Sequence, residues 1–207
     1  MKTLEKLFFH TKMTWTRVLW AAVLCGVVVG ALMIPPFLEN TSLRQPGTTF
    51  EFWIRAALVI ILNCEKPVEA GLKTFVFFLI SQPIIYLVQV PFSWLHWGIF
   101  SYYPYWAKLT LLTLPGGMLA WYVRRGDILA SLLLCAAEGL LCLVLPTYVR
   151  HVLRAFPEML LAALFTAGEI VLLPTVLLRP KWLRLAVIVL AAGMAVLFAL
   201  HDAGLLF

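Results

Sequence analysis

Long apolar runs dominate this chain and constrain its fold more than any motif does. A helix that crosses a membrane needs about 20 predominantly apolar residues. Several stretches reach or approach that length, and one is shorter. The stretches are Trp15–Ile34, Phe50–Asn63, Val68–Val90, Tyr105–Val123, Ile128–Leu145, Met159–Leu178 and Leu183–Leu200. The sequence therefore predicts an all-α fold with seven transmembrane helices, of which the second is short.

The composition supports a protein embedded in lipid. Of the 207 residues, 63% are hydrophobic and 13% are charged. Soluble domains contain about 45–50% apolar and about 25% charged residues. A chain folded in water would leave much of this apolar surface uncovered. We expect one polytopic transmembrane domain over residues 1–207, without a separate soluble domain, in a bacterial cytoplasmic (inner) membrane.

The distribution of basic residues predicts the orientation. Lys and Arg are enriched in cytoplasmic loops, and with seven spans most of them fall on the side of the N-terminus. These residues are Lys2, Lys6, Lys12, Arg17, Lys66, Lys73, Arg124, Arg125, Arg179, Lys181 and Arg184. The N-terminus is therefore expected inside and the C-terminus outside. If Phe50–Asn63 does not span, the count falls to six and the later topology inverts.

Two glutamates lie near the middle of predicted spans. An ionisable residue at the bilayer centre costs about 2.5–3.5 kcal/mol on insertion scales, so Glu138 and Glu169 are candidates for an ion- or proton-binding site. Their helices follow each other closely, so the two carboxyl groups are expected to face each other with one proton or a cation between them. Alternatively, each is protonated and hydrogen-bonded, or pairs with Arg55 or Lys108.

The third apolar stretch carries a polar stripe. Gln82, Tyr86, Gln89 and Ser93 share one face of a helix with 3.6 residues per turn. Such stripes turn away from lipid, either as packing or as the wall of a pathway. We expect Gln82, Tyr86 and Gln89 to line a substrate path, in which Arg55 or Lys108 neutralises an anionic substrate or a carboxylate.

Helix breakers accompany these polar positions. Pro83 follows Gln82, Pro115-Gly116-Gly117 interrupts the fourth stretch, and Pro174 follows Glu169. Proline removes a backbone donor and frees a carbonyl four residues earlier. Broken helices near a midplane charge are typical of transporter sites.

The segment Pro91–Trp106 is rich in Trp, Tyr and Phe. Trp and Tyr collect at headgroup depth, so the segment is expected to form an interfacial belt. The alternative is an aromatic lid over an outer vestibule that binds a cationic or flat ligand by stacking.

The segment Asn63–Lys73 is interpreted as a cytoplasmic turn that starts a helix. Pro67 suits the first helical position. Glu69 favours the first turn and is placed four residues before Lys73, the preferred order for an ion pair.

A second candidate site lies in Thr147–Glu158, where Arg150, His151, Arg154 and Glu158 are expected at the outer interface. Arg binds phosphate and His exchanges protons, which would suit an enzyme that acts on lipid headgroups. The alternative is a solvated amphipathic loop.

No metal-binding, haem-ligating or phosphate-loop pattern occurs in the sequence, so we expect no cofactor and no metal. The leading functional hypothesis is a small transporter or channel coupled to protons or cations. The alternatives are the headgroup enzyme and a scaffold or accessory subunit. The expected partners are the bilayer, a small molecule or ion, and a second copy or membrane subunit, but not nucleic acid.

Overall fold

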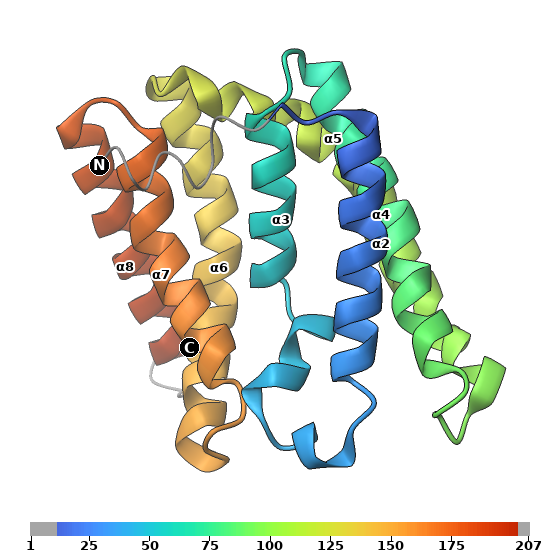
Figure 1. Ribbon diagram of the computed structural model, residues 1–207. Coiled ribbons are helices and arrows are strands. Elements are labelled where there is room, and N and C mark those ends of the chain that lie inside the picture. The colour runs from blue at the N-terminus through green and yellow to red at the C-terminus, as the bar shows by residue number, and fades with distance from the viewer. Residues whose placement is uncertain (1–11, 203–207) are drawn as a thin grey trace. The chain divides into compact units, whose positions relative to one another are not determined.

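The computed structural model describes residues 12–202, which form α-helices joined by short 3-10 helices and loops, without a strand in that range (Figure 1). Lys2 and Lys6, which enter the orientation argument, lie outside these residues. The α-helices are α2 (Trp15–Leu32), α3 (Glu51–Leu62), α4 (Pro67–Gln89), α5 (Tyr103–Ala120), α6 (Ile128–Arg154), α7 (Leu160–Leu177) and α8 (Lys181–Asp202). The 3-10 helices are η1 (Pro36–Leu38), η2 (Ser42–Gly47), η3 (His96–Tyr102) and η4 (Trp121–Arg125).

Five of the described helices are long and apolar enough to cross a membrane, namely α2, α4, α6, α7 and α8. Helix α3 has 12 residues, and at about 1.5 Å per residue it covers about 18 Å of a hydrocarbon core about 30 Å thick. Helix α5 has 18 residues but is not among the five. The protein is therefore an all-helical, multi-pass membrane protein, and the count of seven spans and the orientation stay predictions.

The helices continue through their prolines. Helix α4 passes Pro83, α5 passes the Pro115-Gly116-Gly117 sequence, and α6 passes Pro146 to end at Arg154. The expectation of an interrupted fourth helix is therefore wrong, and α6 is longer than the predicted Ile128–Leu145. Backbone groups in an apolar environment find partners only within the helix, so the helix persists although one hydrogen bond is lost.

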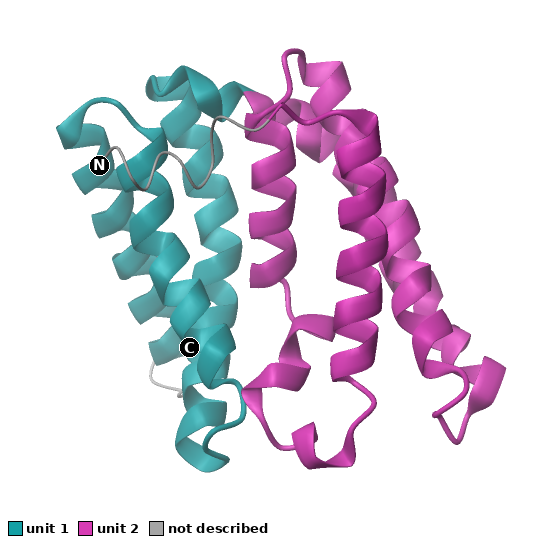
Figure 2. Ribbon diagram, in the orientation of Figure 1, with its two compact units in different colours: residues 1–5, 122–207 teal, residues 6–121 magenta. Residues whose placement is uncertain are grey.

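The chain divides into two compact units, which Figure 2 shows in different colours. Unit 2 is Lys6–Trp121 and contains α2, α3, α4 and α5. The described part of unit 1 begins at Tyr122 and contains α6, α7 and α8. Each unit contains candidate membrane spans, and we describe the two units separately.

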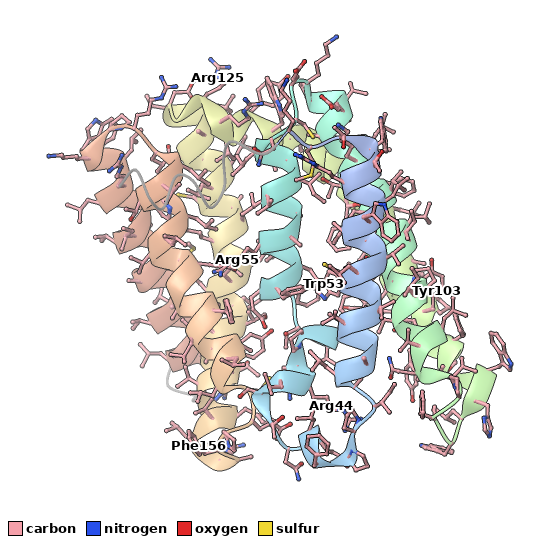
Figure 3. The ribbon with its side chains drawn as sticks, in the orientation of Figure 1. Arg44, Trp53, Arg55, Tyr103, Arg125 and Phe156 are labelled. Carbon is pink, nitrogen blue, oxygen red and sulfur yellow. The ribbon has the colours of Figure 1, made fainter. Side chains whose placement is uncertain are left out.

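Close approach of backbones holds unit 2 together. A Cβ atom on Gly26 of α2 would lie 2.8 Å from the carbonyl oxygen of Ser81 in α4, and one on Gly30 would lie 2.9 Å from that of Ile85. Small residues four apart are a common means of packing membrane helices. Beside this crossing, Trp53 of α3 lies in the buried core of the unit (Figure 3).

The turn before α4 has the predicted structure. Helix α4 begins at Pro67, and the carboxylate of Glu69 pairs with the ammonium of Lys73 and accepts a hydrogen bond from the Glu65 amide at 2.9 Å. Lys73 also donates to the carbonyl of Met13, and its side chain is buried. The interpretation of this segment as a helix start is confirmed, and Lys73 additionally ties α4 to the residues before α2.

In unit 1, α6 packs against both α7 and α8. The Cys142 thiol of α6 donates a hydrogen bond to the Ala191 carbonyl of α8 at 3.1 Å. At the start of α6, Asp127 caps the helix by accepting a hydrogen bond from the Ala130 amide at 3.0 Å, and its other oxygen lies 2.9 Å from Nε of Arg125.

The close crossing in unit 2 predicts that Gly26→Ala destabilises the protein. The added methyl group has to displace the α4 backbone, and overpacking of this kind costs about 1–3 kcal/mol. Gly116→Ala in α5 is the matched control, because a Cβ there meets no atom within 4 Å. The control is expected to be neutral or to gain up to about 1 kcal/mol from reduced chain entropy. Thermal unfolding in detergent measures both, and equal midpoints for the two variants would contradict the close crossing.

The cap of α6 predicts a pH effect. The hydrogen bond from the Ala130 amide, together with the charge of Arg125, holds the pKa of Asp127 below its ordinary value of about 3.9. A lowered folded-state pKa gives stability that is present above the ordinary value and is lost as pH falls through the folded value. Asp127→Asn keeps a capping side chain but does not titrate.

Thermal unfolding between about pH 6 and about pH 2 tests this cap. We expect wild type to lose more stability on acidification than Asp127→Asn does, so that the two converge at the acidic end. Parallel curves for the two proteins would show that the Asp127 charge does not stabilise α6.

Candidate functional site

The two midspan glutamates are buried. The exposed fraction is 0% for Glu138 and 1% for Glu169. Glu138 lies on the buried stripe of α6 with Leu134 and Cys142, and Glu169 lies on that of α7 with Thr166. Helical spacing places both carboxyl groups on faces that turn away from lipid, as the sequence predicts.

The Glu138 carboxyl group is buried without a hydrogen-bond partner among residues 12–202, for either of its oxygens. The same holds for the hydroxyl of Thr166 on α7, which is 0% exposed. Glu138 and Glu169 therefore do not share a hydrogen bond in this structure, and whether they face each other stays a prediction. Most buried polar groups in proteins are satisfied, so an exception on this helix calls for an explanation.

Chemically, such a carboxyl group has two stable forms. Burial of an isolated charged carboxylate is very unfavourable. Glu138 is therefore expected either to hold a proton or to bind a cation.

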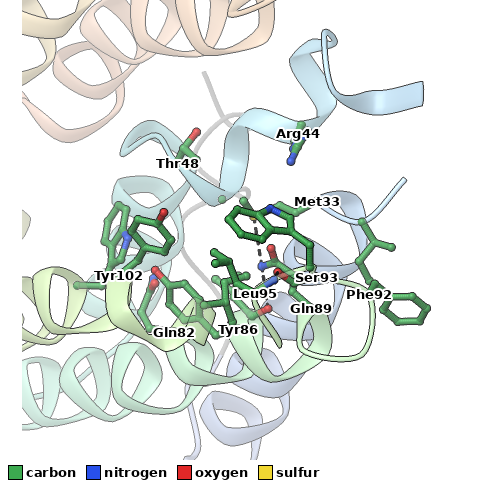
Figure 4. A pocket seen from close by; sticks show the side chains of 16 residues that line it. Met33, Arg44, Thr48, Gln82, Tyr86, Gln89, Phe92, Ser93, Leu95 and Tyr102 are labelled. Atoms are coloured by element: carbon green, nitrogen blue, oxygen red, sulfur yellow. Dashed lines mark hydrogen bonds between the residues drawn. The ribbon is translucent and has the colours of Figure 1, made fainter. Parts of the chain in front are cut away.

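Unit 2 contains a cavity of about 440 Å³ (Figure 4). Its walls come from the end of α2, from η2, from α4 and the loop after it, from η3 and from the start of α5. Gln82, Tyr86 and Gln89 of α4 line it together, with Ser93 beyond the helix. The volume falls within the range of about 300–1,000 Å³ that is usual for small-molecule sites. The predicted polar stripe is thus assembled at one cavity.

The aromatic segment contributes both to this cavity and to the surface. Trp94, Tyr102 and Trp106 line the cavity. Trp94 lines the cavity and is 86% exposed, whereas Trp97 is 68% exposed and does not line it. Part of Pro91–Trp106 therefore lines the cavity and part of it is exposed, and the interfacial belt and the aromatic lid both stay predictions.

Residues from η2 complete the cavity and were not foreseen. Arg44 and Thr48 line it, and Nη1 of Arg44 lies 3.2 Å from the Glu39 carboxylate. The chain between the first two apolar stretches has no periodic pattern, so no feature of the sequence pointed to these two residues. Arg55 is half-buried in α3, Lys108 is exposed on α5, and neither lines the cavity. Arg44 is the basic residue that does.

The candidate headgroup site lies where α6 ends. Arg150, His151 and Arg154 belong to the last turns of α6, and Glu158 follows in a turn. Nε2 of His151 is 3.6 Å from the Glu158 carboxylate, and Arg154 is exposed. The structure therefore brings His151 and Glu158 together by chain reversal rather than by helical spacing.

Comparisons of the chain with protein-family models, with curated proteins and with solved structures found no match. In the described range, no group of three or more His, Cys, Asp or Glu side chains is placed to hold a metal ion.

The unpartnered carboxyl group predicts that Glu138→Leu stabilises the fold. Removing a buried polar group without a hydrogen bond is expected to raise the free energy of unfolding by about 1–3 kcal/mol. Thermal unfolding in detergent measures this. A destabilised Glu138→Leu variant would indicate that the carboxyl group is satisfied and structural. Leu134→Ala on the same buried stripe is expected to destabilise by about 2–5 kcal/mol, which checks that the assay reports packing in α6.

Proposed function

We propose that the protein is a small multi-pass membrane transporter or channel whose activity depends on a proton or cation held by Glu138. The observation that carries the proposal is the complete burial of Glu138 with neither carboxylate oxygen bonded to the described protein. An ionisable residue inside a membrane is costly and is therefore a functional candidate by default.

A purely structural role explains this residue poorly. A glutamate kept for packing would be expected to hydrogen-bond to a neighbour, because an unpaired buried polar group destabilises the fold. On α7, which packs against α6, the Thr166 hydroxyl is also buried without a partner among the described residues. Glu169, which is 1% exposed on α7, is the second carboxyl group that we assign to ion or proton binding.

The proposal also assigns residues to the substrate path and a placement of the protein in the membrane. Gln82, Tyr86 and Gln89 line the substrate site, supported by their shared cavity. Arg55 and Lys108 are kept as candidates to neutralise a carboxylate or an anionic substrate elsewhere on the path. We place the protein in a bacterial cytoplasmic membrane with seven spans, N-terminus inside and C-terminus outside. The distribution of basic residues supports this placement.

The experiment compares wild type with Glu138→Gln, which has nearly the same shape and cannot ionise. Protein reconstituted in liposomes is given a pH gradient, and proton movement is followed with an entrapped pH-sensitive dye. Glu138→Gln is expected to fall to the rate of protein-free liposomes while its thermal unfolding stays cooperative. Glu65→Gln is the control, because Glu65 is exposed in the turn before α4. The proposal fails if Glu138→Gln carries protons as wild type does.

The enzyme alternative keeps one supporting observation, the His151–Glu158 pair at 3.6 Å. That pair is a known arrangement for proton exchange. Its His151 side chain is 49% exposed, so it lacks the enclosure that a reacting site normally has. The scaffold alternative, with a second copy or a membrane subunit as partner, predicts that neither Glu138→Gln nor His151→Ala changes any activity of the reconstituted protein.

A further inference from the structure

We propose that the cavity of unit 2 binds a small, uncharged, flat heterocycle with hydrogen-bond donors and acceptors along one edge, of the nucleobase type. The site is distinct from Glu138. The inference concerns equilibrium binding, so it holds or fails independently of proton flux.

Charge in the cavity excludes the other simple ligand classes. Among the described residues that line it, none is acidic. A cationic ligand would therefore meet the positive charge of Arg44 and no acidic side chain in the cavity wall. An anionic ligand would find only Arg44, whose guanidinium already lies 3.2 Å from Glu39 and whose side chain is 31% exposed. Moving a charge into such a site is unfavourable, so an uncharged ligand fits best.

Polar groups without protein partners face this cavity. Gln82 is 4% exposed, and its amide makes no hydrogen bond to a described residue. The Tyr86 hydroxyl is likewise without such a bond in the described range, and its ring packs against Phe100 and Tyr103. These polar atoms are not among the fully buried unsatisfied ones, so they reach the open cavity, where a ligand can bond them in place of water.

A third polar group is held in a fixed position. Nε2 of Gln89 donates to the Ile85 carbonyl at 2.9 Å and lies 3.6 Å from Sδ of Met33. Its amide oxygen accepts no hydrogen bond from described residues and remains available as an acceptor. Gln82 and Gln89 are seven residues apart, which is about 10 Å along the helix. The polar edge of the cavity therefore has the length of a molecule of one or two rings.

A flat ligand also needs an apolar surface on which to stack, and the aromatic segment Pro91–Trp106 supplies it. Trp94, Tyr102 and Trp106 line the cavity (Figure 4). Aromatic side chains stack on any nucleobase-type ring, because each such ring has a π-face. A glutamine amide can form two hydrogen bonds with the donor–acceptor edge of such a ring. A non-flat polar molecule would use the amides but not the rings.

The test measures equilibrium binding of radiolabelled adenine and uracil to the full chain in lipid nanodiscs, without an ion gradient. At least one of the two is expected to bind saturably and to be displaced by the unlabelled compound. Gln82→Met, which keeps the size of the side chain but loses the amide, is expected to weaken binding about tenfold or more. Tyr86→Phe is expected to weaken it about three- to tenfold.

Tyr105→Phe is the matched control, because Tyr105 is 58% exposed and does not line the cavity. It is expected to bind as wild type does.

Competition with choline, benzoate and glucose tests the three excluded properties, namely positive charge, negative charge and a ring that is not flat. The proposal is overturned if neither base binds, if any of the three competitors displaces the base as well as the base itself, or if Tyr86→Phe and Gln82→Met both bind like Tyr105→Phe. If Gln82→Met does not fold, Tyr86→Phe alone decides the outcome.

Discussion

Desolvation of polar groups is the constraint on which the rest of this structure depends. In an apolar environment every backbone amide and carbonyl has to find its partner within the protein, and helices provide that partner locally. This explains why α4, α5 and α6 continue through Pro83, Pro115 and Pro146. Lipid is as apolar as the surfaces of these helices, so the hydrophobic effect does not drive the helices together. Close packing does so instead, and helices therefore meet at glycines such as Gly26 and Gly30.

Because most polar groups in such a protein are hydrogen-bonded, side chains without a hydrogen-bond partner are functional candidates. Unit 1 keeps a buried Glu138 whose oxygens have no partner in the described chain. Unit 2 keeps Gln82 and Tyr86 at the wall of a cavity. The first group suits a proton or a cation because it is a carboxyl group, and the second suits an uncharged ligand because an amide and a phenol are neutral at physiological pH.

Periodicity made part of this predictable from the sequence. The burial of Glu138 and Glu169 and the shared face of Gln82, Tyr86 and Gln89 follow from helical spacing on apolar helices. The Glu69–Lys73 pair follows from their spacing and order. These features depend only on residues close together in one helix, which is the kind of information that a single sequence carries.

Features that depend on distant or irregular segments were not predictable. Arg44 joins the cavity from η2, whose chain path has no periodic signal. Glu158 reaches His151 because the chain reverses after α6, not because of helical spacing. Helix α5 continues through Pro115-Gly116-Gly117 because a backbone in an apolar environment needs internal hydrogen bonds, which local helix propensity does not take into account.

The central claim is that Glu138 carries an exchangeable proton or cation inside the membrane. Infrared difference spectra between wild type and Glu138→Gln in lipid, recorded in H2O and in D2O, test it most directly. A solvent-reachable Glu138 is expected to show one of two signatures at neutral pH. Either a carboxylic-acid carbonyl band, absent from the variant, shifts on exchange into D2O, or a carboxylate band responds to the added cation. A Glu138 band that neither exchanges in D2O nor responds to any cation would contradict the account.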